Sequence, residues 1–147
     1  LDDLRAEIEA DLNEGEQALL RSLEQPGASE SIAVLDDFFA GRSLTAVQGI
    51  HERLEADGLA AMPGTQESFH RVIEVLAHSE GSATIINCRV DGGVLVRRLP
   101  TGVETVDDVI VRYVSENSVE FSNGRWLLAG GETLVRTEGS QSCDDIS

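Results

Sequence analysis

The fold is decided by residues 106–127, which have the sequence VDDVIVRYVSENSVEFSNGRWL. Asn123-Gly124 fits a type I′ turn, because both central residues of that turn need a positive φ. The dipeptide predicts a hairpin between a long strand over 106–121 and another strand that begins at Arg125. Apolar and polar side chains alternate along the long strand, which indicates a sheet with one buried face and one face open to water.

More strands are predicted upstream of this hairpin. Residues 69–77 and 83–90 are β-branched and apolar enough for strands, and a loop over 79–82 joins them as a hairpin. A shorter strand over 94–96 lies between two turns, 91–93 and 100–102. Downstream, Gly130-Gly131 suggests a bulge or bend, and such glycines occur where a sheet wraps around a cavity.

Helical periodicity is confined to the first part of the chain. Leucines and isoleucines recur at helical spacing over about 1–24, with Gly15 as a candidate kink or break. A second helix is predicted over 29–40, capped by Gly41, and a third after Ser43 as N-cap. The predicted fold class is therefore α+β, with N-terminal helices packed on a strongly curved antiparallel sheet. We expect an N-terminal helix over 1–28 and one α+β domain over 29–147 with a polar tail.

The net charge of the chain disfavours some classes of binding partner. The 147 residues carry 27 acidic and 11 basic side chains, for a net charge of −16. Such an excess repels phosphate backbones and anionic lipids, so nucleic acid and membrane surfaces are poor partners. It favours solubility, with attraction of a basic partner or a cation as the alternative. No apolar run is long enough to span a bilayer. The chain begins at Leu1 without an initiator Met, so we expect a mature or trimmed form.

The two cysteines, Cys88 and Cys143, are expected to form a disulfide. Cys143 lies in a polar tail, where a free thiol would be open to oxidation. A bridge between the two would stabilise the fold by roughly 4 kcal/mol in the chain-entropy model. Two cysteines without a nearby histidine pair do not make a zinc site. The bridge implies an oxidising compartment, and we therefore expect a secreted or cell-envelope protein.

Several short motifs carry a resemblance to a known family. They are Thr84–Asp91 with its central cysteine, the Asn123–Leu127 hairpin, the late Cys143 and the helix start Gly41–Leu44. In this order they resemble exported actinobacterial proteins of the nuclear-transport-factor-2-like and ketosteroid isomerase-like superfamily, whose cystatin-like fold is cone-shaped. The resemblance covers about residues 30–143. The chain departs from it at Asn123, where aspartate is usual. The resemblance implies an extracytoplasmic domain and supplies no catalytic residues.

A cone of this kind can host acid/base chemistry, which needs a carboxylate of raised pKa and an oxyanion donor. The candidate catalytic residues are Tyr113, Asp36, His51 and His70, with Asp37, Glu74 and Trp126 as further polar candidates. Each has a structural alternative. The structural alternative is favoured for three of them: Tyr113 is a core tyrosine, His51 a boundary residue and Trp126 a packing residue. Phosphate-loop, nucleophile-elbow and metal-ligand motifs are missing, so we predict no metal and no cofactor.

Three functions remain open. The leading hypothesis is a non-enzymatic exported domain that binds a small apolar ligand or a protein partner, with Phe39, Tyr113 and Trp126 as candidate ligand contacts. The first alternative is an isomerase- or hydrolase-like enzyme that works inside the cone. The second is a structural or dimerisation module of the cell envelope, a homodimer through its exposed sheet face. In that case the cone is expected to be filled by its own side chains: Phe38, Phe39, Phe69 and Phe121.

Overall fold

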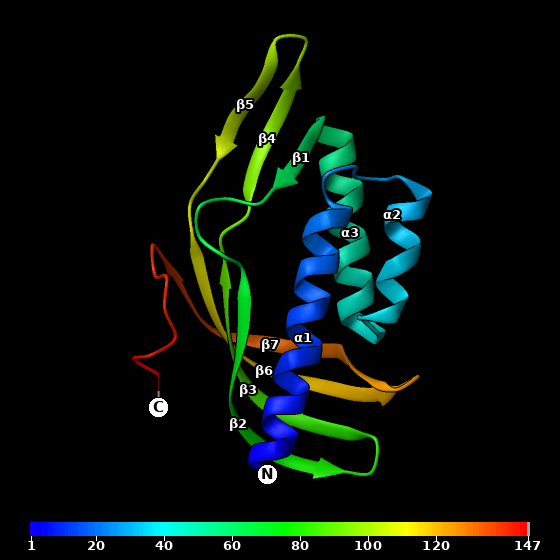
Figure 1. Ribbon diagram of the computed structural model, residues 1–147, viewed down its shortest axis with the longest axis vertical. Coiled ribbons are helices and arrows are strands. Elements are labelled where there is room, and N and C mark those ends of the chain that lie inside the picture. Colours follow the sequence, from blue (N-terminus) through cyan, green and yellow to red (C-terminus); the bar gives the residue numbers. More distant parts are fainter. Residues whose placement is uncertain (147) are drawn as a thin grey trace.

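The helices occupy the first part of the chain and the strands follow them (Figure 1). The computed structural model describes residues 1–146. Its elements are α1 (Asp2–Ser22), α2 (Ser29–Ala33), the 3₁₀ turn η1 (Val34–Asp37), α3 (Gly41–Asp57), β1 (Leu59–Met62), β2 (Phe69–Ser79), β3 (Ser82–Asp91), β4 (Val94–Leu99), β5 (Gly102–Asp107), β6 (Val111–Ser122) and β7 (Arg125–Glu138). The predicted α+β class is confirmed.

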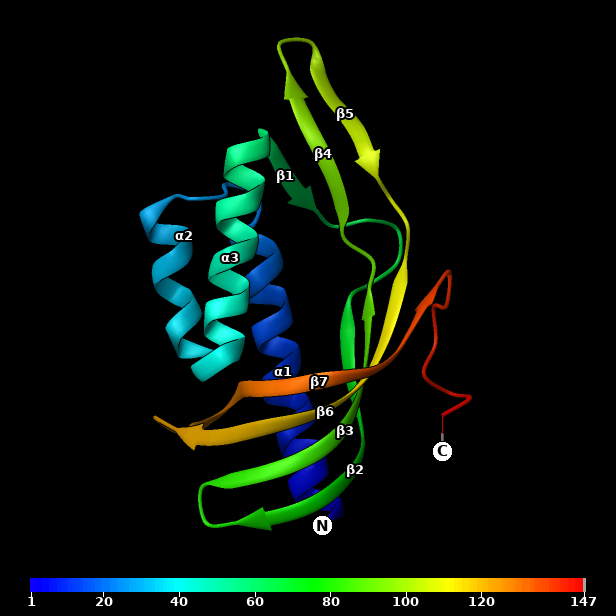
Figure 2. The same ribbon diagram turned by 180° about the vertical axis from the view of Figure 1, so that it is seen from behind.

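The strands form two antiparallel sheets. The larger has the order β2-β3-β6-β7, and the smaller has the order β1-β4-β5. The larger sheet curves around α1, and α2 and α3 lie on the same side, as Figure 2 shows from behind. The β4–β5 hairpin projects away from the helices. This arrangement leaves one concave side, which the helices only partly cover.

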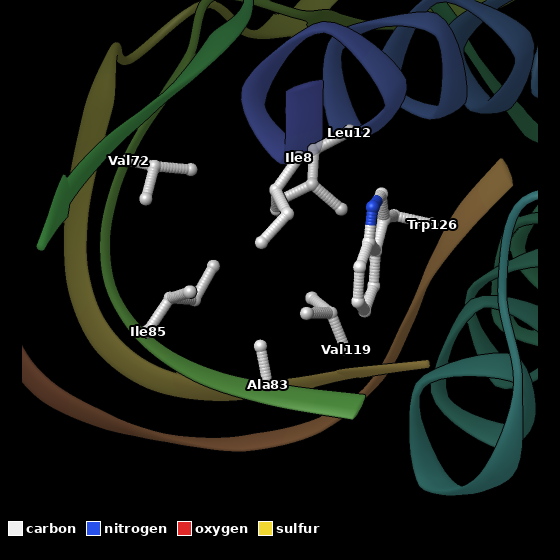
Figure 3. Close-up of a cluster of buried hydrophobic side chains, with 7 residues drawn as sticks. All are labelled: Ile8, Leu12, Val72, Ala83, Ile85, Val119 and Trp126. Carbon is white, nitrogen blue, oxygen red and sulfur yellow. The ribbon is translucent and has the colours of Figure 1, made fainter. Parts of the chain in front are cut away.

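The core lies where the first half of α1 enters the curve of the sheet (Figure 3). Apolar side chains at helical spacing on α1 meet alternate side chains of four strands, because every second residue of a strand points to the same face. The cluster consists of Ile8, Leu12, Val72, Ala83, Ile85, Val119 and Trp126. Removal of this apolar surface from water is the main stabilising contribution of the first helix. The N-terminal segment therefore shares its core with the sheet.

Gly15 does not break α1, which is continuous from Asp2 to Ser22. The glycine instead makes room for Phe38. A Cβ at position 15 would lie 3.3 Å from the Cβ of Phe38, which is tighter than an ordinary contact. The break that Gly15 suggested is therefore absent, and the missing side chain serves packing between α1 and the segment after η1.

The second predicted helix is shorter than expected. It ends at Ala33 and continues as η1, because the next residues pair with β7. The backbone N–H of Ala40 donates to the carbonyl oxygen of Leu128 at 2.9 Å, and Leu128 donates to the carbonyl of Phe38 at 3.2 Å. Gly41 is consequently the first residue of α3 rather than a C-cap, and Ser43 lies inside that helix.

The strand predicted over 106–121 is interrupted. Residues 108–110 link β5 in the smaller sheet to β6 in the larger one, so the alternating pattern spans two sheets. The smaller sheet also contains β1, for which the sequence showed no signal. The hairpin at Asn123-Gly124 is confirmed, with φ of 53° and 81° at the two turn residues.

The C-terminal tail lies on the convex side of the larger sheet, opposite the helices (Figures 1 and 2). The predicted disulfide between Cys88 and Cys143 is confirmed, and both cysteines are buried. Two ion pairs flank it, from Arg71 to Asp144 and from Arg112 to Asp145 at 2.6 Å. The tail is thus held against β2, β3 and β6 at three points.

Candidate ligand-binding site

A cavity of about 400 Å³ opens on the concave side of the molecule. Its walls come from α1, α3 and strands of both sheets. Most of the buried wall is aliphatic: Leu19, Leu20, Leu23, Leu54, Ala61 and Val111. The second half of α1 supplies Leu19 and Leu20, and Leu23 is its C-cap, because the apolar stripe that packs on the sheet at Ile8 continues along the helix. An apolar cavity of this size suits a small ligand.

Glu16 is a buried carboxylate in the wall of this cavity, with a side-chain exposure of 1%. It lies on the apolar stripe of α1, and Arg89 on β3 neutralises it. Arg89 donates from Nε to Oε1 and from Nη2 to Oε2 at 3.1 Å, which makes a two-pronged ion pair. Asp91 lies 3.6 Å from the same guanidinium. Both carboxylate oxygens of Glu16 are thereby occupied.

This ion pair sets the charge state of the inner wall. Burial opposes ionisation of Glu16, but the Arg89 guanidinium and a hydrogen bond from His70 outweigh it and hold the pKa well below its usual range. Burial also acts against the charge on Arg89, and Glu16 overcomes it, so the pKa of Arg89 is raised. Glu16 is therefore a permanent anion, unlike the raised-pKa carboxylate that acid/base catalysis needs.

A row of polar side chains continues from Glu16 across the larger sheet. His70 Nε2 lies 3.4 Å from Glu16, and His70 Nδ1 lies 2.9 Å from Asn87 Nδ2. Asn87 Nδ2 also donates to Asn117 Oδ1 at 3.2 Å, and Asn117 donates to the carbonyl of Gly130 at 3.1 Å. The Gly130 carbonyl can only accept, so the amide nitrogen of Asn117 faces it and Asn117 Oδ1 faces Asn87. Asn87 therefore turns its own amide nitrogen towards both Asn117 Oδ1 and His70 Nδ1. His70 Nδ1 is then an acceptor, and the ring carries its proton on Nε2, facing Glu16.

Tyr113 lines the cavity from β6, as its alternation in the strand predicted. It is half-buried between two cations. The Arg89 guanidinium lies 5.6 Å from the ring centroid, and the Arg136 guanidinium lies 6.0 Å from it. Tyr113 thus contacts both Arg89 of the buried ion pair and Arg136, which is exposed to solvent.

The opening of the cavity is marked by lining residues that are exposed to solvent. They are Arg53, Asp57, Asp107, Val109 and Arg136. Arg53 and Asp57 lie one turn apart on α3, and the other three lie on or beside β5 and β7. The opening is therefore charged, while the interior is largely aliphatic.

His51 is placed differently from the expectation of a boundary position. It is completely buried, with 0% exposure, and clamps α3 to the end of α1. Its Nδ1 accepts from the backbone N–H of Gly27 at 3.1 Å, and its Nε2 lies 2.9 Å from Ser22 Oγ. Burial lowers the pKa of His51, and the Glu55 carboxylate offsets only part of this effect. The ring is a neutral structural link outside the cavity wall.

The remaining predicted site residues do not line the cavity. Asp36, Asp37 and Glu74 are exposed. Phe39 and Trp126 are buried in the two apolar clusters of the core. Trp126 packs at 67° to Phe121, with ring centroids 5.3 Å apart, and donates from its indole nitrogen to Glu7. Of the proposed set, the structure therefore brings only Tyr113 to the cavity, with His70 one contact behind Glu16.

None of Phe38, Phe39, Phe69 and Phe121 contributes to the wall of this cavity, although Phe39 is buried in the core nearby with Leu19 and Ala61. Within residues 1–146, no three His, Cys, Asp or Glu side chains are grouped closely enough to hold a metal ion. No helix in the same range is long and apolar enough to cross a bilayer.

Comparison with known proteins supports the fold alone. No family model matches the chain, and no curated protein matches it. Among solved structures, the chain is similar to the intermembrane space region of the chloroplast protein ARC6, with a TM-score of 0.58 and 16% identity. The match covers 83% of this chain and 92% of that one. A de novo designed β-sheet protein matches with a TM-score of 0.39 and 12% identity, over 93% of this chain and 94% of the design.

Sequence reasoning missed Glu16 and Arg89, the ion pair in the cavity wall. One signal was present. Glu16 stands four residues after Leu12 and three before Leu19, so a carboxylate interrupts the apolar stripe of α1. A charge at such a position is rarely left unpaired when the helix is buried. The position of Glu16 in the stripe thus predicts a buried ion pair, but it does not identify Arg89 as the partner of Glu16.

Proposed function

We propose that this protein binds a small apolar ligand in the cavity between α1, α3 and the two sheets. The observation that carries the proposal is the aliphatic wall of a cavity of about 400 Å³ that the chain's own phenylalanines leave open. Apolar walls with a few converging polar groups are the usual make-up of small-molecule sites.

The enzymatic alternative has weaker support. An isomerase- or hydrolase-like site needs a carboxylate or histidine poised to take up a proton. Glu16 has a lowered pKa, and both of its oxygens accept hydrogen bonds from Arg89. His51 is engaged by Ser22 and Gly27. Because both groups are engaged in these contacts, neither supports the enzymatic alternative.

The disulfide supports an extracytoplasmic location as part of this proposal. Cys88 and Cys143 form a buried bridge, and structural disulfides persist in oxidising compartments. Secretion and membership of the nuclear-transport-factor-2-like superfamily are proposals at the same level. The helices on the concave side of a curved sheet favour that superfamily, and the short motifs around Cys88 and Asn123-Gly124 agree with it.

A blocking substitution tests the function. N-phenyl-1-naphthylamine, an uncharged probe that fluoresces in apolar surroundings, is titrated into the wild type, Val109→Trp and Val103→Trp. Val109 is at the opening of the cavity with 48% exposure, whereas Val103 on β5 is 52% exposed and away from the wall. We expect the probe to bind the wild type and Val103→Trp, and to bind Val109→Trp at least about tenfold more weakly, a change of roughly 1.4 kcal/mol. Equal binding to all three, or none to the wild type, contradicts the proposal.

A further inference from the structure

Arginines and carboxylates both line the cavity. Arg53, Arg89 and Arg136 share the lining with Glu16, Asp57, Asp91 and Asp107. Arg89 forms an ion pair with Glu16 and lies 3.6 Å from Asp91. The other two arginines are exposed at the opening, where the polar group of a ligand would lie.

The three arginines are not equally free. Arg89 is committed to Glu16 and lies near Asp91. Arg136 donates from Nη1 to Glu138 at 3.1 Å and also contacts Tyr113, but its side chain is exposed to solvent. Arg53 forms no ion pair with any residue in the described range 1–146. The donors available to a ligand therefore lie at the opening, on α3 and β7.

We propose that the ligand is an amphipathic carboxylate, whose head group is bound by Arg53 and Arg136 at the opening while its hydrocarbon part lies among the leucines of the wall. This inference rests on the proposed function. Guanidinium groups hold carboxylates by two parallel hydrogen bonds, and such charge-assisted bonds are about twice as strong as neutral ones. The aliphatic interior accounts for the hydrocarbon part, and the charged opening accounts for the head.

Two features oppose an anion, and neither outweighs the arginines. The net charge of −16 repels anions at long range, but the Debye length at physiological salt is only about 8 Å, so nearby groups decide. Asp57 and Asp107 also lie at the opening. A cationic head would meet them, yet it would share the opening with two guanidinium groups. The Tyr113 ring, which could otherwise hold it, already has cations at 5.6 and 6.0 Å.

Three probes of equal chain length separate the possibilities: decanoate, decanol and decylammonium. Each displaces N-phenyl-1-naphthylamine from the wild type, Arg53→Gln, Asp57→Asn and Glu52→Gln at neutral pH. The three substituted side chains are all exposed on α3, and Glu52 is outside the cavity wall. We expect decanoate to bind the wild type about tenfold more tightly than decanol, the size of one charge-assisted contact. Arg53→Gln should remove most of that difference, Asp57→Asn should enlarge it, and Glu52→Gln should leave it unchanged.

The other outcomes overturn the inference in distinguishable ways. If decanol and decanoate bind equally and Arg53→Gln has no effect, the ligand carries no anionic head, while the apolar-ligand function stands. If decylammonium binds most tightly and Asp57→Asn weakens it, the head group is a cation. If none of the three probes nor the naphthylamine binds the wild type, the proposed function fails together with the inference.

Discussion

Arg89 donates hydrogen bonds to both carboxylate oxygens of Glu16, across 73 residues of sequence and between the first helix and the third strand. This ion pair joins α1 to β3, and its carboxylate is buried. It also forms part of the wall of the cavity, so its contribution to stability must be separated from any contribution to binding.

Arg89→Met is expected to destabilise the protein strongly. The substitution leaves the Glu16 carboxylate buried with only His70 beside it, and removal of one partner of a buried pair costs about 3–5 kcal/mol. Arg97→Met is the control, because its ion pair with Glu104 is exposed on the β4–β5 hairpin and should change stability by at most about 1 kcal/mol. Urea unfolding measures both. Equal, small changes in the two variants would show that the buried pair does not stabilise the fold.

The acid sensitivity of the protein should depend on Glu16. In the unfolded chain this carboxyl titrates near its usual value of about 4.3, whereas the folded protein keeps it ionised to much lower pH. The unfolded state then binds the extra proton, and the unfolding free energy falls as pH falls below about 4.3, by up to about 1.4 kcal/mol per pH unit from this group. Glu16→Gln should lose that part of the slope. Parallel curves for wild type and variant between about pH 4 and pH 2.5 would contradict the assignment.

A separate pH dependence is expected from His51, in a higher range. Burial lowers the pKa of this ring in the folded protein, so below about pH 6.5 the unfolded chain takes up a proton that the folded chain refuses. Stability should therefore fall from about pH 6.5 downwards in the wild type, and His51→Gln should flatten this decline. His78→Gln is the matched control, because His78 is exposed near the end of β2. Chemical unfolding at intervals across that range makes the comparison, and a decline that persists in His51→Gln would exclude the ring as its source.

The disulfide should stabilise the protein substantially. Cys88 and Cys143 are 55 residues apart, and closure of a loop of that length stabilises by roughly 4 kcal/mol in the chain-entropy model. Cys88→Ser combined with Cys143→Ser should lower the free energy of unfolding by about that amount. Asp144→Asn, which removes only the exposed ion pair with Arg71, should have a much smaller effect. A cysteine-free variant as stable as the wild type would show that the disulfide does not stabilise the fold.

Sequence patterns predicted the elements whose signals are local. The Asn123-Gly124 hairpin, the helical stripe of α1 and the pairing of Cys88 with Cys143 each depend on a few residues or on a unique combination. The strand break at 108–110 could not be seen, because alternation is the same whether the strand continues in one sheet or crosses to another. In that case sheet topology decides, and topology depends on contacts between distant segments.

The site was harder to predict for the same reason. Alternation along its strand put Tyr113 on the apolar face, from which it could reach the cone, but alternation alone does not show which face turns inward. The partnership of Glu16 with Arg89 depends on how α1 sits along β3, which no local pattern specifies. His51 was assigned to the boundary because charged residues flank it, whereas its own face of α3 meets the end of α1. The sequence predicted that these helices form, but it did not predict how they pack against the sheet and against each other.

The enclosure of α1 by the curved sheet has a consequence for how the protein folds. Ile8 and Leu12 lie on the first helix, but their cluster includes Val119 and Trp126 from β6 and β7. The hydrogen bond from Trp126 to Glu7 spans 119 positions. Contacts of such high sequence separation slow folding, because long loops must close before the contacts form. The cluster around Ile8 can therefore be completed only after the hairpin of β6 and β7 has formed.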